Sequence, residues 1–402
     1  MSTLLVLGGA DGALGTIGAA SRLGVRTLCV DSRTDAPGIA RADEFLSVST
    51  RDIGAIERAI AGRDDLQGVI SPASDVNLPA QFELAQRLGL PNGLSIDAVR
   101  ASIDKGFFRD VCARIGLVNP SYVQGTFDHV LCHSNALRWP VMVKPADSSG
   151  GRGVSRCDNV AQLAAACIEA AAWSRSRTVI VEEFVAGDDV GAEAFVIDGR
   201  VALLAIGSRT LTDRPHFVTT ETRVALPDQR WEAVRRCLDA ICAELGYRWG
   251  SLNADLIVRP DGAVVVVEIG ARLGGNGSAE LLGLAHGIDA SEVAVELAVG
   301  AKPEVRPVLH RHAASRILGA PSEGKLVAID GVGAARAVPG ISQVVLAAEA
   351  GDHVAPYTKA GAKLGYLLAA GATADAVGKA LDRAHRLLTV RVAHPDLDRS
   401  EQ

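Results

Sequence analysis

The stretch Val141–Val154, with the sequence VMVKPADSSGGRGV, decides the fold of this 402-residue chain. It begins as a short apolar run that contains Lys144, breaks at Pro145, and continues into the glycine-rich segment Ser148–Gly153. Glycines let the backbone approach a ligand closely, and the exposed N–H groups, hydroxyls and guanidinium of such a loop favour an anion, most simply a phosphate chain. Lys144 precedes the glycines, which excludes the GxxxxGK[ST] phosphate loop. A flexible hairpin beside a surface lysine is the alternative interpretation.

The composition indicates a globular protein. Apolar residues make up 48% of the chain and charged residues 22%, and the net charge is -6. No apolar run reaches about 18 residues and the N-terminus resembles no signal peptide, so we expect a cytoplasmic protein without a membrane partner. The weakly acidic balance argues against nucleic acid as a partner. The 7 cysteines include no CxxC pair, which favours buried thiols over a zinc site or a disulfide framework.

The N-terminal segment alternates strand-like and helical stretches, which predicts a small, doubly wound parallel sheet. A strand over Leu4–Leu7 is followed by the glycine-rich segment Gly8–Gly15, by a helix to Leu23 and by a second strand that ends at Asp31. An acid at this place invites a dinucleotide site, but the glycines do not fit GxGxxG. We therefore favour a glycine-rich turn, with a place in a substrate pocket, over NAD binding.

Two lysines, together with a strand that ends in acidic residues, indicate a binding site for a nucleoside triphosphate. Lys105 lies in a predicted helix over 101–115, and together with Lys144 it would supply positive charge where an ATP reaction accumulates negative charge. Taken alone, Lys105 is better explained as a solvated helix residue. A predicted strand over 179–181 leads into Glu182–Asp189, whose first carboxylate and backbone groups can bind an adenine edge. Asp189, seven residues later, can reach ribose hydroxyls.

The segments Leu252–Val258 and Val264–Arg272 are separated by the turn sequence Arg259–Gly262, which predicts a hairpin. Asp255 and Glu268 lie at comparable distances on either side of the turn, so we expect them opposite each other. Facing carboxylates repel unless a cation lies between them, and magnesium, with hard oxygen ligands and nucleotide phosphates, is the expected ion. A register slip of one residue would instead place one acid on each face of the sheet.

Two further polar segments are candidate substrate contacts. The segment Arg209–Arg223, which contains His216 and Glu221, is either a lid over the substrate or a surface loop. His216 and Glu221 are also the candidates for a general base, although neither is a strong one. The segment Leu273–Ser278 either cradles a substrate carboxylate, which we favour, or is a flexible link; the candidate contacts in it are Gly274, Gly275 and Asn276.

The order and spacing of these motifs resemble the ATP-grasp superfamily over roughly residues 100–275. The motifs are DKGFFR, VMVKP, SSGGRG, VEEFVAGDD and VEIGAR. The C-terminal stretch EAGDHVAPYTKAGAKLGYLLAAGAT is similar to the carboxylate-amine ligase branch, and in particular to L-amino acid ligases. The resemblance implies an α/β architecture that is α+β in the grasp portion. It comprises a doubly wound parallel α/β domain at 1–98, a two-lobed nucleotide-binding region at 99–308 and an α+β domain at 309–402.

The resemblance also implies a role for each motif residue. Lys105 and Lys144 contact ATP phosphates. Arg272 meets the transferred phosphoryl group, and Lys144 and Arg152 share its negative charge. The implied contacts of the remaining residues are with the phosphates for Ser148, Ser149, Gly150, Gly151 and Gly153, with adenine for Glu182, Glu183, Phe184 and Val185, and with ribose for Asp189.

One position departs from the family pattern. The superfamily commonly has an asparagine two residues after the glutamate of the metal site, and here that position is Gly270. The first metal would still be held by Asp255 and Glu268. A second metal would depend on water, on Asn253 or Asn276, or would bind weakly.

The resemblance implies an ADP-forming ligase with ATP and Mg2+ as cofactors. It would join a carboxylate and an amine through an acyl phosphate, and its substrates would be an amino acid and a second amino acid or small acid. A purine-pathway enzyme or a biotin carboxylase is the alternative within the superfamily. A non-catalytic nucleotide-binding protein, in which Gly270 has abolished turnover, is the alternative outside enzymes. A homodimer is left open.

Overall fold

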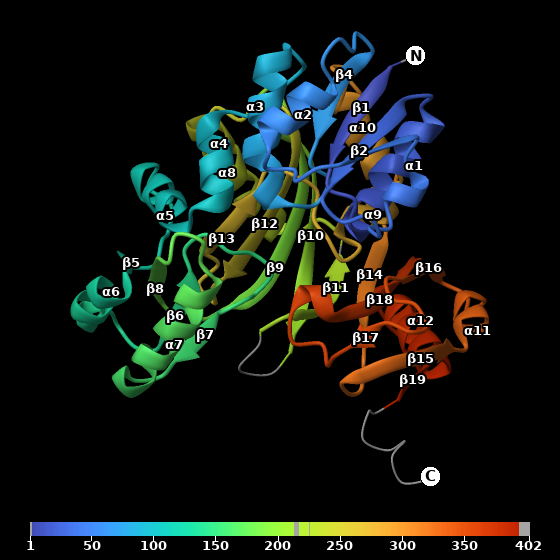
Figure 1. The fold of residues 1–402 in the computed structure, drawn as a ribbon. Coiled ribbons are helices and arrows are strands. Elements are labelled where there is room, and N and C mark those ends of the chain that lie inside the picture. The colour runs from blue at the N-terminus through green and yellow to red at the C-terminus, as the bar shows by residue number, and fades with distance from the viewer. Residues whose placement is uncertain (1, 213–216, 225, 394–402) are drawn as a thin grey trace, which may run out of the picture.

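The computed structural model describes residues 2–212, 217–224 and 226–393, which form the sheets and helices of Figure 1. The N-terminal sheet is parallel, in the order β3-β2-β1-β4. Leu4 and Val6 pack on one face of it and Leu5 and Leu7 on the other, so both faces are covered and the doubly wound sheet is confirmed. Its elements are β1 (Thr3–Leu7), η1 (Asp11–Ala13), α1 (Leu14–Arg22), β2 (Arg26–Asp31), η2 (Ile39–Arg41), β3 (Glu44–Ser47), α2 (Ile53–Ala59), β4 (Leu66–Ile70), η3 (Asp75–Asn77) and α3 (Leu78–Leu88).

The single helix expected over 101–115 is wrong, because the chain forms two helices there: α4 (Ile96–Ile103) and α5 (Lys105–Arg114). Asp104 separates them in an extended conformation, and its carboxylate accepts a hydrogen bond from the Phe107 N–H at 3.0 Å, as an N-cap residue does. Lys105 therefore begins a helix. Its N–H donates to the Ala146 carbonyl at 3.1 Å, which ties it to the strand that carries Lys144.

A small antiparallel sheet in the order β5-β8-β6-β7 contains the decisive stretch. Val141 and Val143 of β6 are fully buried in its core, and strand alternation turns Lys144 to the opposite face. The elements are β5 (Tyr122–Gly125), α6 (Phe127–His133), η4 (Ser134–Ala136), β6 (Val141–Pro145), β7 (Ser155–Cys157), α7 (Val160–Trp173) and β8 (Val179–Glu183). In Figure 1 this sheet lies apart from the N-terminal sheet, with strands of the central sheet between them.

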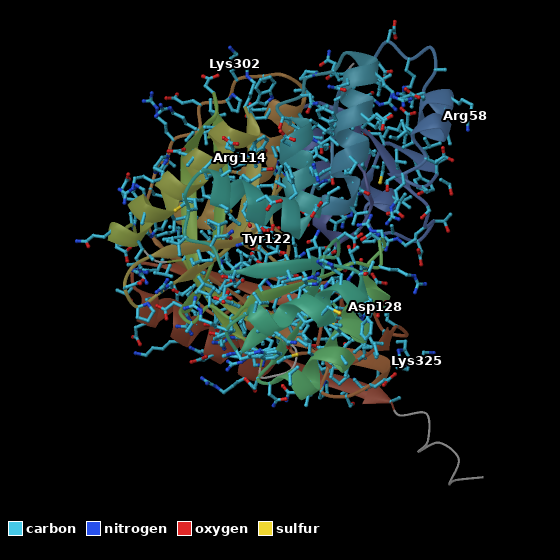
Figure 2. The ribbon with its side chains drawn as sticks, turned by 90° about the vertical axis from the view of Figure 1, so that its left-hand side faces the viewer. Arg58, Arg114, Tyr122, Asp128, Lys302 and Lys325 are labelled. Atoms are coloured by element: carbon cyan, nitrogen blue, oxygen red, sulfur yellow. The ribbon has the colours of Figure 1, made fainter. Side chains whose placement is uncertain are left out.

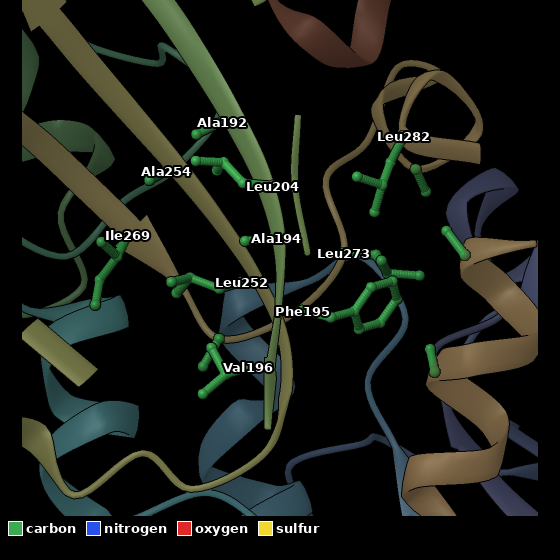
Figure 3. Close-up of a cluster of buried hydrophobic side chains, with 14 of the residues drawn as sticks. Ala192, Ala194, Phe195, Val196, Leu204, Leu252, Ala254, Ile269, Leu273 and Leu282 are labelled. Carbon is green, nitrogen blue, oxygen red and sulfur yellow. The ribbon is translucent and has the colours of Figure 1, made fainter. Parts of the chain in front are cut away.

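The central sheet has eight strands in the order β13-β12-β9-β10-β11-β14-β18-β16. Its core includes Phe195, Leu252 and Leu273, which belong to one buried cluster (Figure 3). The expected polar loop over 209–223 is largely strand, because β10 continues to Leu211 and β11 begins at Thr219. The first elements of this region are β9 (Asp188–Ile197), β10 (Arg200–Leu211), β11 (Thr219–Val224), α8 (Gln229–Leu245), β12 (Gly250–Val258), β13 (Val264–Gly270), α9 (Ser278–His286) and α10 (Ala290–Ala298).

The C-terminal segment shares the central sheet, to which it contributes β14, β18 and β16. A second sheet in the order β17-β15-β19 packs beside it. The domain limits at 98 and 308 stay a prediction. The elements are β14 (His312–Gly319), β15 (Gly324–Asp330), α11 (Val332–Arg336), β16 (Ile341–Leu346), β17 (His353–Val354), η5 (Ala360–Ala362), β18 (Lys363–Gly371), α12 (Ala374–Leu387) and β19 (Thr389–Ala393).

Charged side chains are spread over the outside of the molecule, as Arg58, Lys302 and Lys325 illustrate at separate places in Figure 2. None of the helices in the described ranges combines the length and the apolar composition that a membrane span requires. The cytoplasmic location stays a prediction.

Candidate active site

A cleft of about 620 Å³ lies between the N-terminal loops, the small sheet and the central sheet. Alternate residues of the central strands face it, because strand side chains point to opposite faces in turn. The glycine-rich turn of the N-terminal domain lines the cleft as expected, through Gly8, Gly12 and Gly15. The residues that face the cleft from the central strands are Asp189, Gly191 and Glu193 of β9, Ala205, Gly207, Arg209 and Leu211 of β10, Asn253, Asp255 and Ile257 of β12, and Val265, Val267 and Glu268 of β13.

Asp31, the acid that invited a dinucleotide interpretation, holds the glycine-rich turn itself. Its carboxylate accepts a hydrogen bond from the Gly9 N–H and pairs with Arg33, each at 2.9 Å. Burial opposes its ionisation, but Arg33 and these hydrogen bonds prevail and lower its pKa to about 2. The acid is therefore engaged within the protein, which weakens the NAD interpretation further.

Asp255 and Glu268 are directly paired across β12 and β13, as the hairpin predicts. The register near the turn, where Val258 pairs with Val264, would by itself have placed Asp255 opposite Val267. An irregularity between Asp255 and Leu256 shifts the register by one residue, in the manner of a β-bulge. Val267 and Glu268 consequently both face the cleft, and the two carboxylates lie on one side of the sheet.

Arg109 of α5 stabilises this irregularity through hydrogen bonds to the backbone of β13. Its guanidinium donates to the Val266 carbonyl at 2.6 Å and also to the Val267 carbonyl. The same side chain is 1% exposed and lies 3.4 Å from the Glu182 carboxylate. One buried cation thus links the strand that presents Glu268 to the strand end expected to bind the nucleotide.

The two lysines converge on the cleft from separate segments. Lys105 Nζ donates to the Ser148 carbonyl at 2.6 Å and lies 3.3 Å from Glu268. Lys144 Nζ donates to Glu182 at 2.5 Å. Burial opposes the ionisation of Glu182, but Lys144 and Arg109 outweigh it and lower its pKa. Glu182 is therefore a buried ion-pair partner in this structure, and its contact with adenine stays a prediction.

The neighbouring positions of β8 also line the cleft. Glu183 is held by Arg138, whose Nη2 lies 2.8 Å from its carboxylate. The Arg156 guanidinium stacks 4.2 Å from the centre of the Phe184 ring, and Phe184 and Val185 both border the cleft. An aromatic ring beside backbone groups at a strand end is suited to hold an adenine base.

Asp189 is paired with Arg209, a cation that the sequence did not single out. Arg209 Nε lies 3.1 Å from Asp189, and its Nη2 donates to Asp255 at 2.7 Å. Burial raises the pKa of Asp189, although Arg209 opposes the shift. Arg209 therefore bridges the expected ribose acid and one acid of the expected metal site.

The loop Ser148–Gly153 has the conformation that its glycines permit. Gly150, Gly151 and Gly153 have φ values of 73°, 74° and 66°, in the left-handed region that side chains disfavour. Arg152 Nε donates to the Ser149 carbonyl at 3.0 Å, so the arginine folds back onto the loop. Residues 148–152 border the cleft, and Gly153 lies beside them against Trp173.

Glu193, which the sequence analysis missed, supports the segment expected to bind a substrate carboxylate. Its carboxylate accepts hydrogen bonds from Asn253 at 2.6 Å and from the Gly274 N–H at 3.1 Å. Burial raises the pKa of Glu193 to about 7. Gly275 and Asn276 border the cleft beside Gly274. A lone acid in the apolar stretch Val190–Val196 was the available sequence signal.

The structure describes one of the two candidates for a general base, Glu221, and places it away from this arrangement. His216 lies outside the described residues. Glu221 pairs with Arg316 at 2.6 Å and with Arg223, and the adjacent Thr222 faces the cleft, so strand alternation turns Glu221 to the opposite side. The expectation that Glu221 contacts the substrate is therefore not supported.

The residues present fit a magnesium ion held mainly by phosphates. No group of three or more metal-binding side chains occurs within the described ranges, so Asp255 and Glu268 would supply two ligands and would leave the rest to phosphate and water. Magnesium usually binds in this way. Lys105 and Arg209 neutralise the two acids in the present arrangement.

Two family models match parts of this chain. The model of the ATP-grasp domain matches residues 137–280, and the model of the L-amino acid ligase C-terminal domain 2 matches residues 316–393. The uncharacterized protein y4rH of Sinorhizobium fredii is 29% identical over 355 residues, which cover 85% of this chain and 72% of that protein. The chloroplastic arginine-specific carbamoyl phosphate synthase large chain of Oryza sativa subsp. japonica is 27% identical over 263 residues, which cover 61% of this chain and 22% of that protein.

Solved structures show the same fold. An L-amino acid ligase from Bacillus licheniformis has a TM-score of 0.84 at 21% identity, with 98% of this chain and 99% of that chain covered. A phosphoribosylglycinamide synthetase from Anaerococcus prevotii has a TM-score of 0.78 at 19% identity, over 98% of this chain and 100% of that chain. A biotin carboxylase from Campylobacter jejuni has a TM-score of 0.76 at 16% identity, over 97% and 92% of the two chains.

Proposed function

Because this chain belongs to the ATP-grasp superfamily, whose cofactors are ATP and magnesium, we propose that it is an ADP-forming carboxylate-amine ligase. It would join an amino acid to a second amino acid or small acid. The observation that carries the proposal is the facing pair Asp255 and Glu268 in one cleft with Lys105 and Lys144. The C-terminal match to L-amino acid ligases favours this branch over others with the same fold.

The proposed reaction has two steps. A carboxylate oxygen attacks the terminal phosphorus of ATP, the bond from that phosphorus to the bridging oxygen breaks, and ADP leaves. The amine nitrogen then attacks the carbonyl carbon of the acyl phosphate, the bond from this carbon to the phosphate oxygen breaks, and phosphate leaves as the nitrogen loses a proton. The first step accumulates negative charge on the transferred group, so positioning and charge stabilisation are the main requirements.

Each group of side chains would stabilise the phosphates from a different side of the cleft. Lys105 and Lys144 would neutralise phosphate charge from the small-sheet side, and the glycine loop would cover the phosphates with its N–H groups. Arg272 would meet the transferred group from the central-sheet side. Asp255 and Glu268 would hold magnesium, which supplies positive charge to the phosphates when bound.

The test is a substrate screen with the full chain. Purified protein is incubated with ATP, magnesium and pairs drawn from a panel of amino acids and small acids, and ADP and new amides are followed by mass spectrometry. ADP release that requires both an acid and an amine supports the proposal. Glu268→Ala should abolish it, whereas Asp261→Asn, in the exposed turn of the same hairpin, should not, because asparagine retains the acceptor for the Ala263 N–H.

The same screen distinguishes the alternatives. Nucleotide binding without substrate-dependent ADP would indicate a non-catalytic protein, and ADP release that requires bicarbonate would indicate a carboxylase-type activity. Stabilisation by NAD but not by ATP would contradict the assignment of the cleft, because a ligand that binds the folded state raises its melting temperature.

A further inference from the structure

An acid of the N-terminal domain reaches into the catalytic centre. Asp75, at the start of η3, accepts hydrogen bonds from Arg272 Nε at 2.8 Å and from Arg272 Nη2 at 2.7 Å. The side chains of Arg272 and Asp75 are 15% and 11% exposed, so the pair is largely withdrawn from water. It joins residues that are 197 positions apart in the chain. Such a parallel, two-point contact fixes the plane of the guanidinium as well as its position.

Gly270 makes room for this contact. A Cβ atom at position 270 would lie 2.4 Å from Asp75 Oδ1 and 3.1 Å from Arg272 Cζ, and the first distance is so short that the Asp75 carboxylate would have to move. The Asp75 carboxylate thus occupies the space that a side chain on β13 would need. At the position where the family commonly has asparagine, this chain has glycine, and the carboxylate of an acid from another domain fills the space of the missing side chain.

The contact leaves part of Arg272 available. A guanidinium carries five N–H donors in a fixed fork. Asp75 engages the Nε and Nη2 edge, and Arg272 Nη1 donates to the Leu273 carbonyl at 3.0 Å. One N–H of Nη1 and one N–H of Nη2 have no partner within the described ranges, and we assign them to the remaining edge of the fork. Arg272 borders the cleft, and this edge is suited to bind two oxygens of one oxyanion.

We propose that Asp75 is a positioning residue that holds Arg272 so that its free edge receives an oxyanion, either the substrate carboxylate or the acyl phosphate formed from it. The inference rests on the proposed function and adds to it a contribution from the N-terminal domain. Asp75 itself does not touch the reacting atoms. Its removal would leave the Arg272 charge in place but lose its orientation.

A matched pair in the same domain provides the control. Arg63 contacts Asp65 in the same two-point manner, with Nε at 2.9 Å and Nη2 at 2.7 Å, but this pair is outside the cleft lining. Asp65→Asn therefore weakens an ion pair of the same two-point geometry without touching the site. If Asp75 acted only as a structural tie, the two substitutions would have similar consequences for ligand binding.

The probe is inorganic phosphate, titrated calorimetrically into the full chain saturated with ADP and magnesium. We expect phosphate to bind the wild type, Arg272→Met to abolish this binding, and Asp75→Asn to weaken it about tenfold with the affinity for ADP unchanged. Asp65→Asn should leave both affinities unchanged. Equal phosphate affinity in wild type and Asp75→Asn, or no phosphate binding to the wild type, would overturn the inference. Failure of the wild type to bind ADP would instead contradict the proposed function.

Gly270→Ala provides a second, independent perturbation in case Asp75→Asn folds poorly. The added methyl group should displace the Asp75 carboxylate and weaken phosphate binding as Asp75→Asn does. In an Asp75→Ala background the collision with the Asp75 carboxylate is removed and only the contact with the Arg272 guanidinium remains, so adding Gly270→Ala should have a smaller further effect. Equal effects of Gly270→Ala in both backgrounds would overturn the role given to Asp75, because double-mutant cycles report coupling only between interacting residues.

Discussion

Replacing Arg109 with methionine should destabilise the protein and weaken its response to magnesium together. The guanidinium contacts Glu182, the Val266 carbonyl and the Val267 carbonyl from an almost fully buried position. Methionine fills a similar space without charge. In the variant, Lys144 would be the only one of the two contacting cations that still pairs with Glu182. The carbonyls of Val266 and Val267 would lose the guanidinium as a hydrogen-bond donor.

The magnitude follows from these contacts. Removing one partner of a buried ion pair costs about 3–5 kcal/mol, because the other charge remains buried. Lys144 still contacts Glu182, which favours the lower end, about 3 kcal/mol. Without Arg109 the irregularity can relax and move Glu268 away from Asp255, so magnesium affinity should fall about tenfold, as when a residue that orients a metal ligand is lost.

The assays are urea denaturation and the magnesium-dependent rise in melting temperature at fixed ATP. Arg114→Met is the control, because Arg114 lies on the same helix but pairs with Glu244 at the surface, where an ion pair contributes about 0–1 kcal/mol. A folded Arg109→Met protein with wild-type stability and a wild-type magnesium response would refute the reasoning.

Three further predictions concern single residues. Burial raises the pKa of Glu193 to about 7, so between the usual glutamate pKa and about 7 the folded protein holds a proton that the unfolded chain has lost. The free energy of unfolding therefore falls as pH rises through this window, and Glu193→Gln should flatten the fall in denaturation curves; an unchanged slope would exclude this titration. Glu268→Ala should abolish ADP formation while the melting curve stays cooperative, and near-normal turnover would remove the metal assignment. Gly270→Asn should lower ADP formation, because the added side chain collides with Asp75; full activity with stronger magnesium dependence would show that an asparagine fits.

The features that could be predicted from the sequence have local determinants. The turn at Arg259–Gly262 and the alternation of the strands predict the hairpin that carries Asp255 and Glu268, but the pairing of these two acids also requires the irregularity between Asp255 and Leu256. The glycines of the loop likewise predict a backbone with positive φ values. The helix break at Asp104 has a local signal too, because aspartate is a favoured N-cap, and the sequence analysis passed over it.

The remaining features depend on contacts between distant segments. Arg109 and Asp75 each meet partners more than 150 positions away. Arg109 ends the DKGFFR motif, but the motif gives no sign of its partners, and Asp75 lies outside the motifs. Arg209 was taken as the start of a loop, although it lies in the strand that faces the cleft. Glu221 was expected at the substrate, but it lies one residue out of phase with the face that lines the cleft, and a one-residue offset reverses a strand side chain.

We propose that a substrate carboxylate attacks the terminal phosphorus of ATP in this cleft. The most direct test uses an acid substrate from the screen, labelled with a heavy oxygen isotope in its carboxylate, together with ATP, magnesium and the amine partner. The mechanism predicts one labelled oxygen in each phosphate released, in step with amide formation. Amide formation that yields only unlabelled phosphate would contradict it.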